Sequence, residues 1–385
     1  MKKPVITLIV ILVLLLALPV YCFIRWSVQS KQPVNVLVLD KTVPTFERSQ
    51  HRSLFTVLTK NRFVSKEKKS YSYKKDYFGF FPLKPLRNKQ YNVERIRLDN
   101  ILDLADRYDV AYFADTYGVY FNDWYEGINK GRRSRMIYGG LNANDYLLMK
   151  EMNDRNKLLI AEYNILGYPT AGLERNKSEE VFGIRWTEWA GKYFCSLDTL
   201  KCPDIPKWIL ENYREQYQAS WNFQKSGIVF VNDAGKVIVL ENETHLDFDM
   251  PYIYSSSTAI DKYGLPYKIG YSNWFSIIES AQNEVISYFK IHVNSMGDSI
   301  LSTNQIPNIF PAVTKTTDGH NNFYFAGDFA NNPVPNFTGY FKDYKKLGLY
   351  RLTDERKCTR KFFWKYYEPL MNGILTEYLK TAAKP

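Results

Sequence analysis

Continuous apolar runs alternate with amphipathic stretches along the first half of the chain. The apolar runs are rich in leucine and β-branched residues, which is typical of strands buried on both faces of a parallel sheet. The amphipathic stretches place their apolar residues at helical spacing, and one of them can be capped by Asn142 or Asn144. This alternation predicts a doubly wound α/β fold with a largely parallel sheet. The expected strands are 34–40, 109–115 and 157–164, and the expected helices are 47–61, 98–108 and 139–156.

Beyond Thr170 the pattern changes to shorter strands and isolated helices, which predicts a second, α+β lobe. The letters "NDAG" between two β-branched runs indicate a hairpin turn. We expect three parts: a segment 1–31, an α/β domain 32–175 and an α+β domain 176–385 in which 323–380 can return to the first sheet. The expected elements of the second lobe are strands at 182–194, 226–249, 308–314 and 323–329, helices at 206–217 and 360–380, and a mixture of helix and strand in 273–293.

The amino-terminal segment has its own pattern. No charged residue occurs from Pro4 to Ile24, which as a helix at 1.5 Å per residue spans about 31 Å, the thickness of one bilayer core. The stretch is longer than the apolar core of a signal peptide and lacks a small-residue cleavage site. We therefore expect an uncleaved transmembrane anchor with the bulk of the chain outside the cytoplasm, and a cleaved signal peptide is the alternative.

The chain contains four cysteines. Cys22 lies in the apolar segment and Cys358 stands alone, whereas Cys195 and Cys202 bracket a short loop. In an oxidising compartment this spacing favours a disulfide between Cys195 and Cys202. Two unpaired thiols are the alternative.

The formal net charge of +11 favours anionic partners such as lipid headgroups or acidic glycans. Two basic clusters, 66–75 and 130–135, carry much of it. The tyrosines within the first cluster can stack on bases, but an anchored chain makes nucleic acid an unfavoured partner. A solvated loop is the simpler interpretation of that cluster.

The order of elements, with "VNVLVLD", "YDVAYFAD", "GGLNANDYLLMKEM" and "KLLIAEYN", resembles the class I glutamine amidotransferase-like α/β fold over Val34 to Thr170. In that family the strand that corresponds to "KLLIAEYN" ends in an elbow carrying a nucleophilic cysteine. Here the elbow falls at Glu162, Tyr163 or Asn164, and the sequence has no cysteine between Cys22 and Cys195. The resemblance therefore implies the fold without glutaminase activity, because the attacking thiolate is missing.

Carboxylates at the ends of the predicted strands are the main candidates for chemistry. In doubly wound sheets, ligands bind beyond the carboxyl ends of the strands, where Asp40, Asp115 and Glu162 are expected. Glu162 and Asp328 both follow apolar runs that can raise a carboxyl pKa, as glycoside cleavage requires of its acid. The simpler interpretation is that Glu162 pairs with an arginine and Asp328 caps a turn.

Other residues are candidates for binding. His245, Asp247 and Asp249 would share one face of an extended strand and could hold a divalent metal, although such a pattern more often marks the solvent-exposed face of an edge strand. Trp186, Trp189 and Trp274 can supply sugar-stacking platforms, with Asp115 and Asn331 as polar ligands, or they can belong to the core. No motif indicates a cofactor.

Three functions remain open from the sequence. The first is a non-catalytic, anchored protein that binds a glycan or another cell-envelope component. The second is a hydrolase acting on envelope polysaccharide through Glu162 and Asp328, and the third is a structural or assembly subunit. The lack of a recognisable catalytic motif favours binding or assembly over an enzyme.

Overall fold

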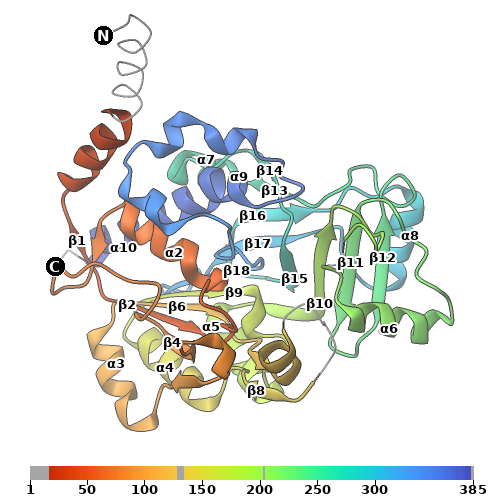
Figure 1. Cartoon of the computed structure of the whole chain (residues 1–385), viewed down its shortest axis with the longest axis horizontal. Coiled ribbons are helices and arrows are strands. Elements are labelled where there is room, and N and C mark those ends of the chain that lie inside the picture. The colour runs from red at the N-terminus through yellow and green to blue at the C-terminus, as the bar shows by residue number, and fades with distance from the viewer. Residues whose placement is uncertain (1–16, 128–133, 203, 383–385) are drawn as a thin grey trace, which may run out of the picture.

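The computed structural model describes residues 17–127, 134–202 and 204–382. Its centre is a ten-stranded sheet to which both halves of the chain contribute (Figure 1). In sheet order the strands are β14 (Lys268–Gly270), β13 (Tyr252–Ser255), β16 (Glu284–Lys290), β17 (Ile309–Lys315), β18 (Asn321–Phe325), β9 (Leu158–Glu162), β6 (Val110–Asp115), β2 (Val36–Asp40), β4 (Phe78–Pro82) and β5 (Tyr91–Glu94).

The prediction of a largely parallel, doubly wound sheet is wrong, because this sheet is mixed. Only the pairings within β18, β9, β6, β2 and β4 are parallel. The other five pairings are antiparallel. The reason is that β18 adds to the parallel core beside β9, so the antiparallel strands that precede it in the chain extend the same sheet. The domain boundaries expected at 31 and 175 stay predictions.

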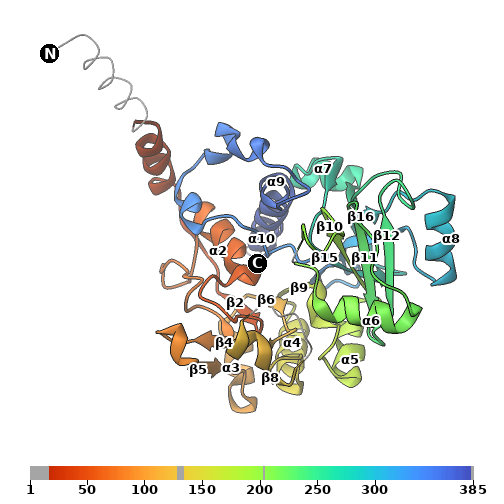
Figure 2. The ribbon, with the colours of Figure 1, turned by 45° about the vertical axis from the view of Figure 1, so that its right-hand side comes forward.

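A second sheet stands beside the carboxyl end of β18. It is antiparallel throughout, in the order β12 (Val237–Glu241), β11 (Gly227–Asn232), β10 (Arg185–Phe194) and β15 (Trp274–Glu279). Figure 2 shows α6 (Lys207–Tyr217) lying across this sheet, where it closes a separate apolar core. Short pairs β1 (Gln32–Pro33) with β3 (Phe63–Val64), and β7 (Val119–Tyr120) with β8 (Met136–Tyr138), complete the strands.

Helices cover both faces of the parallel strands. On one face lie α2 (Ser49–Lys60) and α10 (Glu368–Ala382), and on the other lie α3 (Ile101–Arg107), α4 (Ala143–Asp154) and α5 (Gly172–Phe182). Asn142 caps α4 as predicted, because its side chain accepts from the backbone of Asn144 and Asp145. The remaining helices are α7 (Ser257–Tyr263), α8 (Ser295–Thr303) and α9 (Arg360–Phe362), with short 3-10 or π turns at 86–88, 98–100, 122–126, 163–165, 336–340, 344–347, 349–352 and 363–367.

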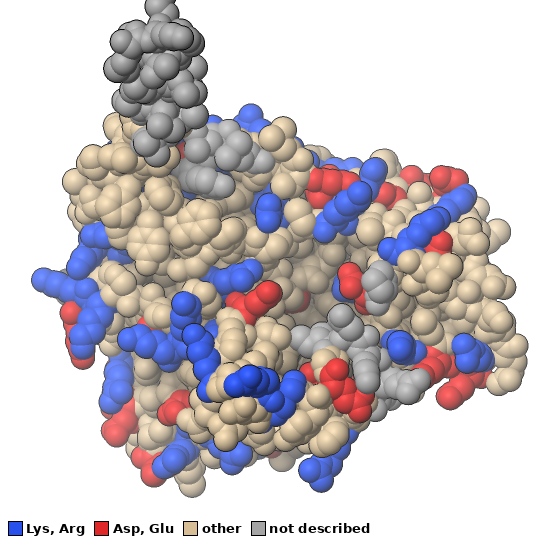
Figure 3. All heavy atoms as spheres, viewed as in Figure 1, with Lys and Arg blue, Asp and Glu red and all other residues tan. Residues whose placement is uncertain are grey.

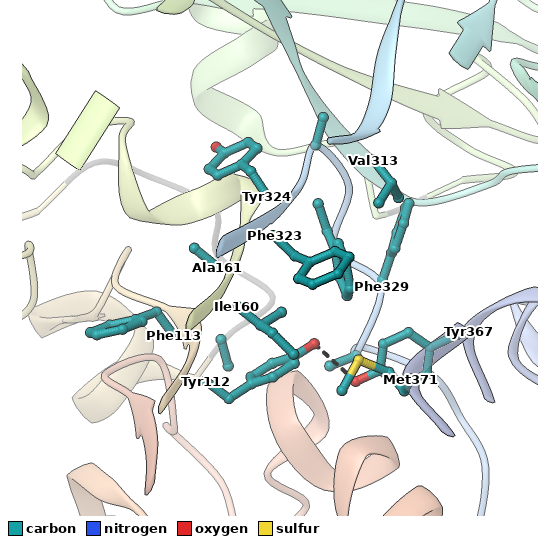
Figure 4. Close-up of a cluster of buried hydrophobic side chains, with 14 of the residues drawn as sticks. Tyr112, Phe113, Ile160, Ala161, Val313, Phe323, Tyr324, Phe329, Tyr367 and Met371 are labelled. Carbon is teal, nitrogen blue, oxygen red and sulfur yellow. Dashed lines mark hydrogen bonds between the residues drawn. The ribbon is translucent and has the colours of Figure 1, made fainter. Parts of the chain in front are cut away.

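Side chains alternate between the two faces of the central strands (Figure 4). Tyr112, Ile160 and Phe323 point to the face that the last helix covers, where the hydroxyls of Tyr112 and Tyr367 lie 2.9 Å apart. These side chains are at most 2% exposed. This contact therefore ties the segment that leads into the last helix to β6.

The predicted membrane anchor must be corrected. Among the described residues, no helix is long and apolar enough to cross a bilayer. Residues 17–27 form a helix whose end packs on the segment near Lys342, whereas residues 4–16 of the predicted span lie outside the described residues. The single span, the membrane as partner and the extracytoplasmic location that depended on it therefore have no support.

Candidate functional site

Four carboxyl groups lie at one edge of the central sheet. Asp40 ends β2, Asp115 ends β6, Glu162 ends β9, and Asp328 follows β18 by three residues. These strands are neighbours and parallel, so their carboxyl ends meet at the same edge. The exposed fractions are 0%, 4%, 0% and 4%, which is unusual for carboxylates.

Asp328 lies where the two sheets meet. Its backbone N–H donates to the carbonyl of Trp274 at 3.0 Å, and its Oδ2 accepts from the amides of Asn273 at 3.0 Å and Asn331 at 2.9 Å. Burial raises the pKa of Asp328 to about 7, although the Asn331 hydrogen bond and the nearby Lys192 charge oppose the shift. A carboxyl with this pKa can both give and take a proton near neutral pH.

Asp115 is held by three donors that converge on its Oδ1. They are the hydroxyl of Thr42 at 2.6 Å, the backbone N–H of Tyr117 at 2.7 Å and the amide of Asn164 at 3.0 Å. Burial raises the pKa of Asp115 well above its usual range, and the charges of Asp40 and Asp328 add to the shift. Asp115 and Asp328 are therefore coupled, so that ionising one disfavours ionising the other.

Glu162 is sealed in the interior. Both of its carboxyl oxygens accept from the backbone N–H of Ala330, at 2.9 and 3.2 Å, and the hydroxyl of Tyr112 donates to Oε1. Burial raises the pKa of Glu162 far above its usual range, with a further contribution from the charge of Asp328. These contacts tie the loop after β18 to the end of β9, so Glu162 serves the fold and is not open to a ligand.

A buried histidine–carboxyl contact and a buried ion pair near this edge were not predicted. His51, on α2, places Nδ1 2.5 Å from Oδ2 of Asp40, and its Nε2 lies 2.9 Å from the carbonyl of Tyr73. Lys41 donates to Asp145 at 2.5 Å, and burial lowers its pKa while Asp145 opposes that shift. The partners come from separate elements, and no spacing in the sequence marks them.

The rim of the site is half-buried. Lys192 on β10 pairs in register with Trp274 on β15, and its ammonium lies 5.5 Å from the centre of that ring. Burial lowers the pKa of Lys192, and Asp328 is among the charges that oppose the shift. Asn331 is also half-buried. Figure 3 shows this face of the molecule hollowed near its middle, over the region where Figure 1 labels β18 and β15.

Two of the predicted sugar platforms are core residues. Trp186 and Trp189 are 8% and 7% exposed, and the indole N–H of Trp186 donates to the carbonyl of Trp189 at 3.0 Å. The guanidinium of Arg175 covers the Trp186 ring at 4.8 Å. Trp274 is half-buried and packs against the edge of the smaller apolar core, and its backbone carbonyl accepts from the N–H of Asp328.

The predicted metal ligands lie elsewhere and are not gathered. His245, Asp247 and Asp249 belong to a turn between β12 and β13, so the alternation that would align them in a strand is absent. Asp249 instead pairs with Arg356 at 2.8 Å. Within the described ranges, no group of three or more His, Cys, Asp or Glu residues could hold a metal ion.

The predicted disulfide is not formed, because Cys195 and Cys202 are both free thiols. Cys195 is exposed at the end of β10, whereas Cys202 is buried in the smaller apolar core with Phe194.

No protein-family model and no curated protein matches the chain. Among solved structures, a ThuA-like protein from Bacteroides uniformis is similar over 91% of this chain and 93% of its own, with 8% sequence identity and a TM-score of 0.36. A similarity of this size does not assign the chain to a family. The amidotransferase-like resemblance of 34–170 therefore stays a prediction.

Proposed function

We propose that the chain binds a glycan at the edge formed by Asp115, Asp328, Trp274 and Asn331. The observation that supports this most is Asp328, a buried carboxyl held by two amides beside a half-buried tryptophan and a half-buried lysine. Sugars present hydroxyl groups in the ring plane and C–H groups on the ring faces. A site for them combines carboxyl and amide groups with an aromatic platform.

Each side chain has a distinct role in this proposal. The Trp274 ring stacks on the sugar face. The Asn331 amide donates one N–H to Asp328, so its carbonyl or its second N–H can bond to a sugar hydroxyl. Asp115 accepts from a second hydroxyl through Oδ2, since the donors described above converge on Oδ1. Lys192 keeps the site from carrying an excess of negative charge.

Hydrolysis of the bound glycan is a second candidate, and the pKa of about 7 at Asp328 favours it. Glycoside hydrolysis requires one carboxyl that stays protonated near neutral pH and a second that acts as base or nucleophile. Asp328 suits the acid, and Asp115 is the partner only when ionised, which its own raised pKa opposes. Glu162 does not take part, because its contacts are interior.

Calorimetric titration with a panel of soluble oligosaccharides (cello-, xylo-, chito- and malto-series) tests binding. W274A and N331A are the site variants, and Y267A, which removes an exposed aromatic ring outside the site, is the matched control. We expect W274A to raise Kd at least tenfold and N331A about fivefold, since one neutral hydrogen bond contributes about 1 kcal/mol. Equal affinities for all four proteins would exclude this site.

Release of reducing ends from the same panel tests hydrolysis. D328N keeps the shape of the carboxyl but cannot supply a proton, so it should bind as wild type does and lose at least 100-fold in rate, given that general acid catalysis contributes about 10²–10⁴-fold. If the wild type binds oligosaccharides without releasing reducing ends, hydrolysis is excluded and the non-catalytic binding function remains. Equal rates for D328N and wild type would remove Asp328 from the reaction.

A further inference from the structure

A cavity of about 360 Å³ lies away from the strand-end site. It opens between the amino-terminal helix, the end of α2 and the segment that follows residue 340. The helix end and this segment are joined by the N–H of Lys342, which donates to the carbonyl of Cys22 at 3.2 Å. Both ribbon views place them side by side (Figures 1 and 2). The cavity is lined by five cations, namely Lys60, Lys342, Lys345, Lys346 and Arg351.

The positive charge in this cavity is only partly compensated. One lining carboxylate, Asp343, is already shared between Arg25 and Lys346, at 3.0 Å from each. Lys60 pairs with Glu368 at 2.6 Å, outside the lining. Among the side chains that the structure describes, no carboxylate pairs with the other three cations, which are Lys342, Lys345 and Arg351.

The cavity also offers a hydrogen-bond acceptor. The side-chain oxygen of Gln29 is buried at its lining and has no donor among the described residues. Leaving a buried acceptor unpaired is unfavourable, so a ligand hydroxyl that donates to it gains binding energy. The cavity therefore suits a ligand that carries both a hydroxyl and a multiply charged anionic group.

We propose that this cavity binds a phosphorylated polyol, with the phosphate among Lys342, Lys345 and Arg351 and a hydroxyl on Gln29. A phosphate monoester carries nearly two negative charges and several acceptor oxygens, whereas a carboxylate carries one charge, and the lining has five cations against one carboxylate. The volume lies within the range of small-molecule sites. Such a ligand would join the amino-terminal helix to the segment around residue 345.

Calorimetry on the full chain tests this, with glucose 6-phosphate and inorganic pyrophosphate as soluble probes. Vesicles of phosphatidylcholine with and without phosphatidic acid provide a sedimentation arm for a lipid-borne phosphate. The site variant K342Q/K345Q/R351Q has a matched control, K68Q/K74Q/K75Q, which removes the same charge from exposed lysines outside the cavity. Both are checked for an unchanged unfolding midpoint, and K345Q alone serves if the triple variant is unstable.

We expect the site variant to bind both soluble probes at least tenfold more weakly, and the control to bind as wild type does at matched ionic strength. Q29A should weaken glucose 6-phosphate while leaving pyrophosphate within twofold. Sedimentation that requires phosphatidic acid and is lost in the site variant would assign the same chemistry to a lipid source. No binding in either arm, or equal losses in site variant and control, would overturn the proposal. The strand-end residues line none of this cavity, so the glycan proposal stands or falls separately.

Discussion

Replacing Asp328 by Asn should remove much of the pH dependence of stability that this site creates. The pKa of Asp328 is raised from 3.8 to about 7 in the folded chain, mainly by burial. Below pH 3.8 both states are protonated and the stabilisation from this group is complete. As the pH rises from 3.8 towards 7, the unfolded chain releases this proton while the folded chain still holds it, so the free energy of unfolding falls. The stabilisation from this group is lost once the pH has passed about 7.

The magnitude follows from the shift. Each pKa unit corresponds to about 1.4 kcal/mol, so a shift of roughly three units gives about 4 kcal/mol in total, of which about 3 kcal/mol is lost between pH 5 and pH 9. Asn keeps the shape and does not titrate. The charge of Asp328 raises the pKa of Asp115, so D328N also lowers the pKa of Asp115. This second change in the pH dependence of stability has the same sign as the first.

Urea unfolding followed by tryptophan fluorescence at pH 5, 6, 7, 8 and 9 measures the effect. The free energy of unfolding of wild type minus that of D328N should fall by about 3 kcal/mol from pH 5 to pH 9. D261N, at an exposed position on α7, provides the matched control. If the wild-type minus D328N difference in the free energy of unfolding stays constant within about 0.5 kcal/mol from pH 5 to pH 9, as expected for the control, Asp328 does not carry a raised pKa in the folded chain.

Three further predictions concern the surroundings of the site. At Glu162, E162Q should change the free energy of unfolding at pH 7 by less than about 1 kcal/mol, because Gln can still accept the interior hydrogen bonds. E162A should lower it by about 3 kcal/mol, because Ala cannot accept them and leaves a cavity. Equal costs for the two variants in urea unfolding would contradict this. H51A should cost about 3 kcal/mol or more by leaving Asp40 buried without its partner, and H51A combined with D40N should recover part of that cost in a double-mutant cycle. In unreduced protein, iodoacetamide should alkylate exposed Cys195 faster than buried Cys202 in peptide mass spectra, and two unmodified residues would instead indicate a disulfide.

Three strands of the parallel core, β2, β6 and β9, were predictable because burial on both faces leaves a strong local signal. The strands ending at Asp40, Asp115 and Glu162 are continuous apolar runs, and Asn142 caps the helix that its position favours. The mixed sheet was not predictable, because tertiary contacts decide which strands pair when the strands are far apart in the chain. The segment 273–293, expected to contain a helix, forms β15 and β16, since its isoleucines and valines at Ile277, Ile278, Val285 and Ile286 pack as strand residues.

The candidate site was predictable only in part. Asp115 and Asp328 follow strands, so the sequence indicated where they lie. It could not separate Asp328, which bonds to side-chain amides beside half-buried residues, from Glu162, whose partners are all interior, because the difference depends on the loop at Ala330 and on Tyr112 from another strand. Lys192 carries no local signal either, since its position beside Trp274 results from pairing between two strands that are far apart in the chain.

The most direct test of the central claim is the dissociation constant of the tightest-binding oligosaccharide for wild type and W274A, measured by calorimetry at pH 6. At this pH the Asp328 carboxyl, with its pKa of about 7, is mostly protonated in the wild type. We expect a measurable Kd for wild type and at least a tenfold higher one for W274A, with Y267A unchanged. Identical constants for wild type and W274A, or no binding of any oligosaccharide by wild type, would contradict it.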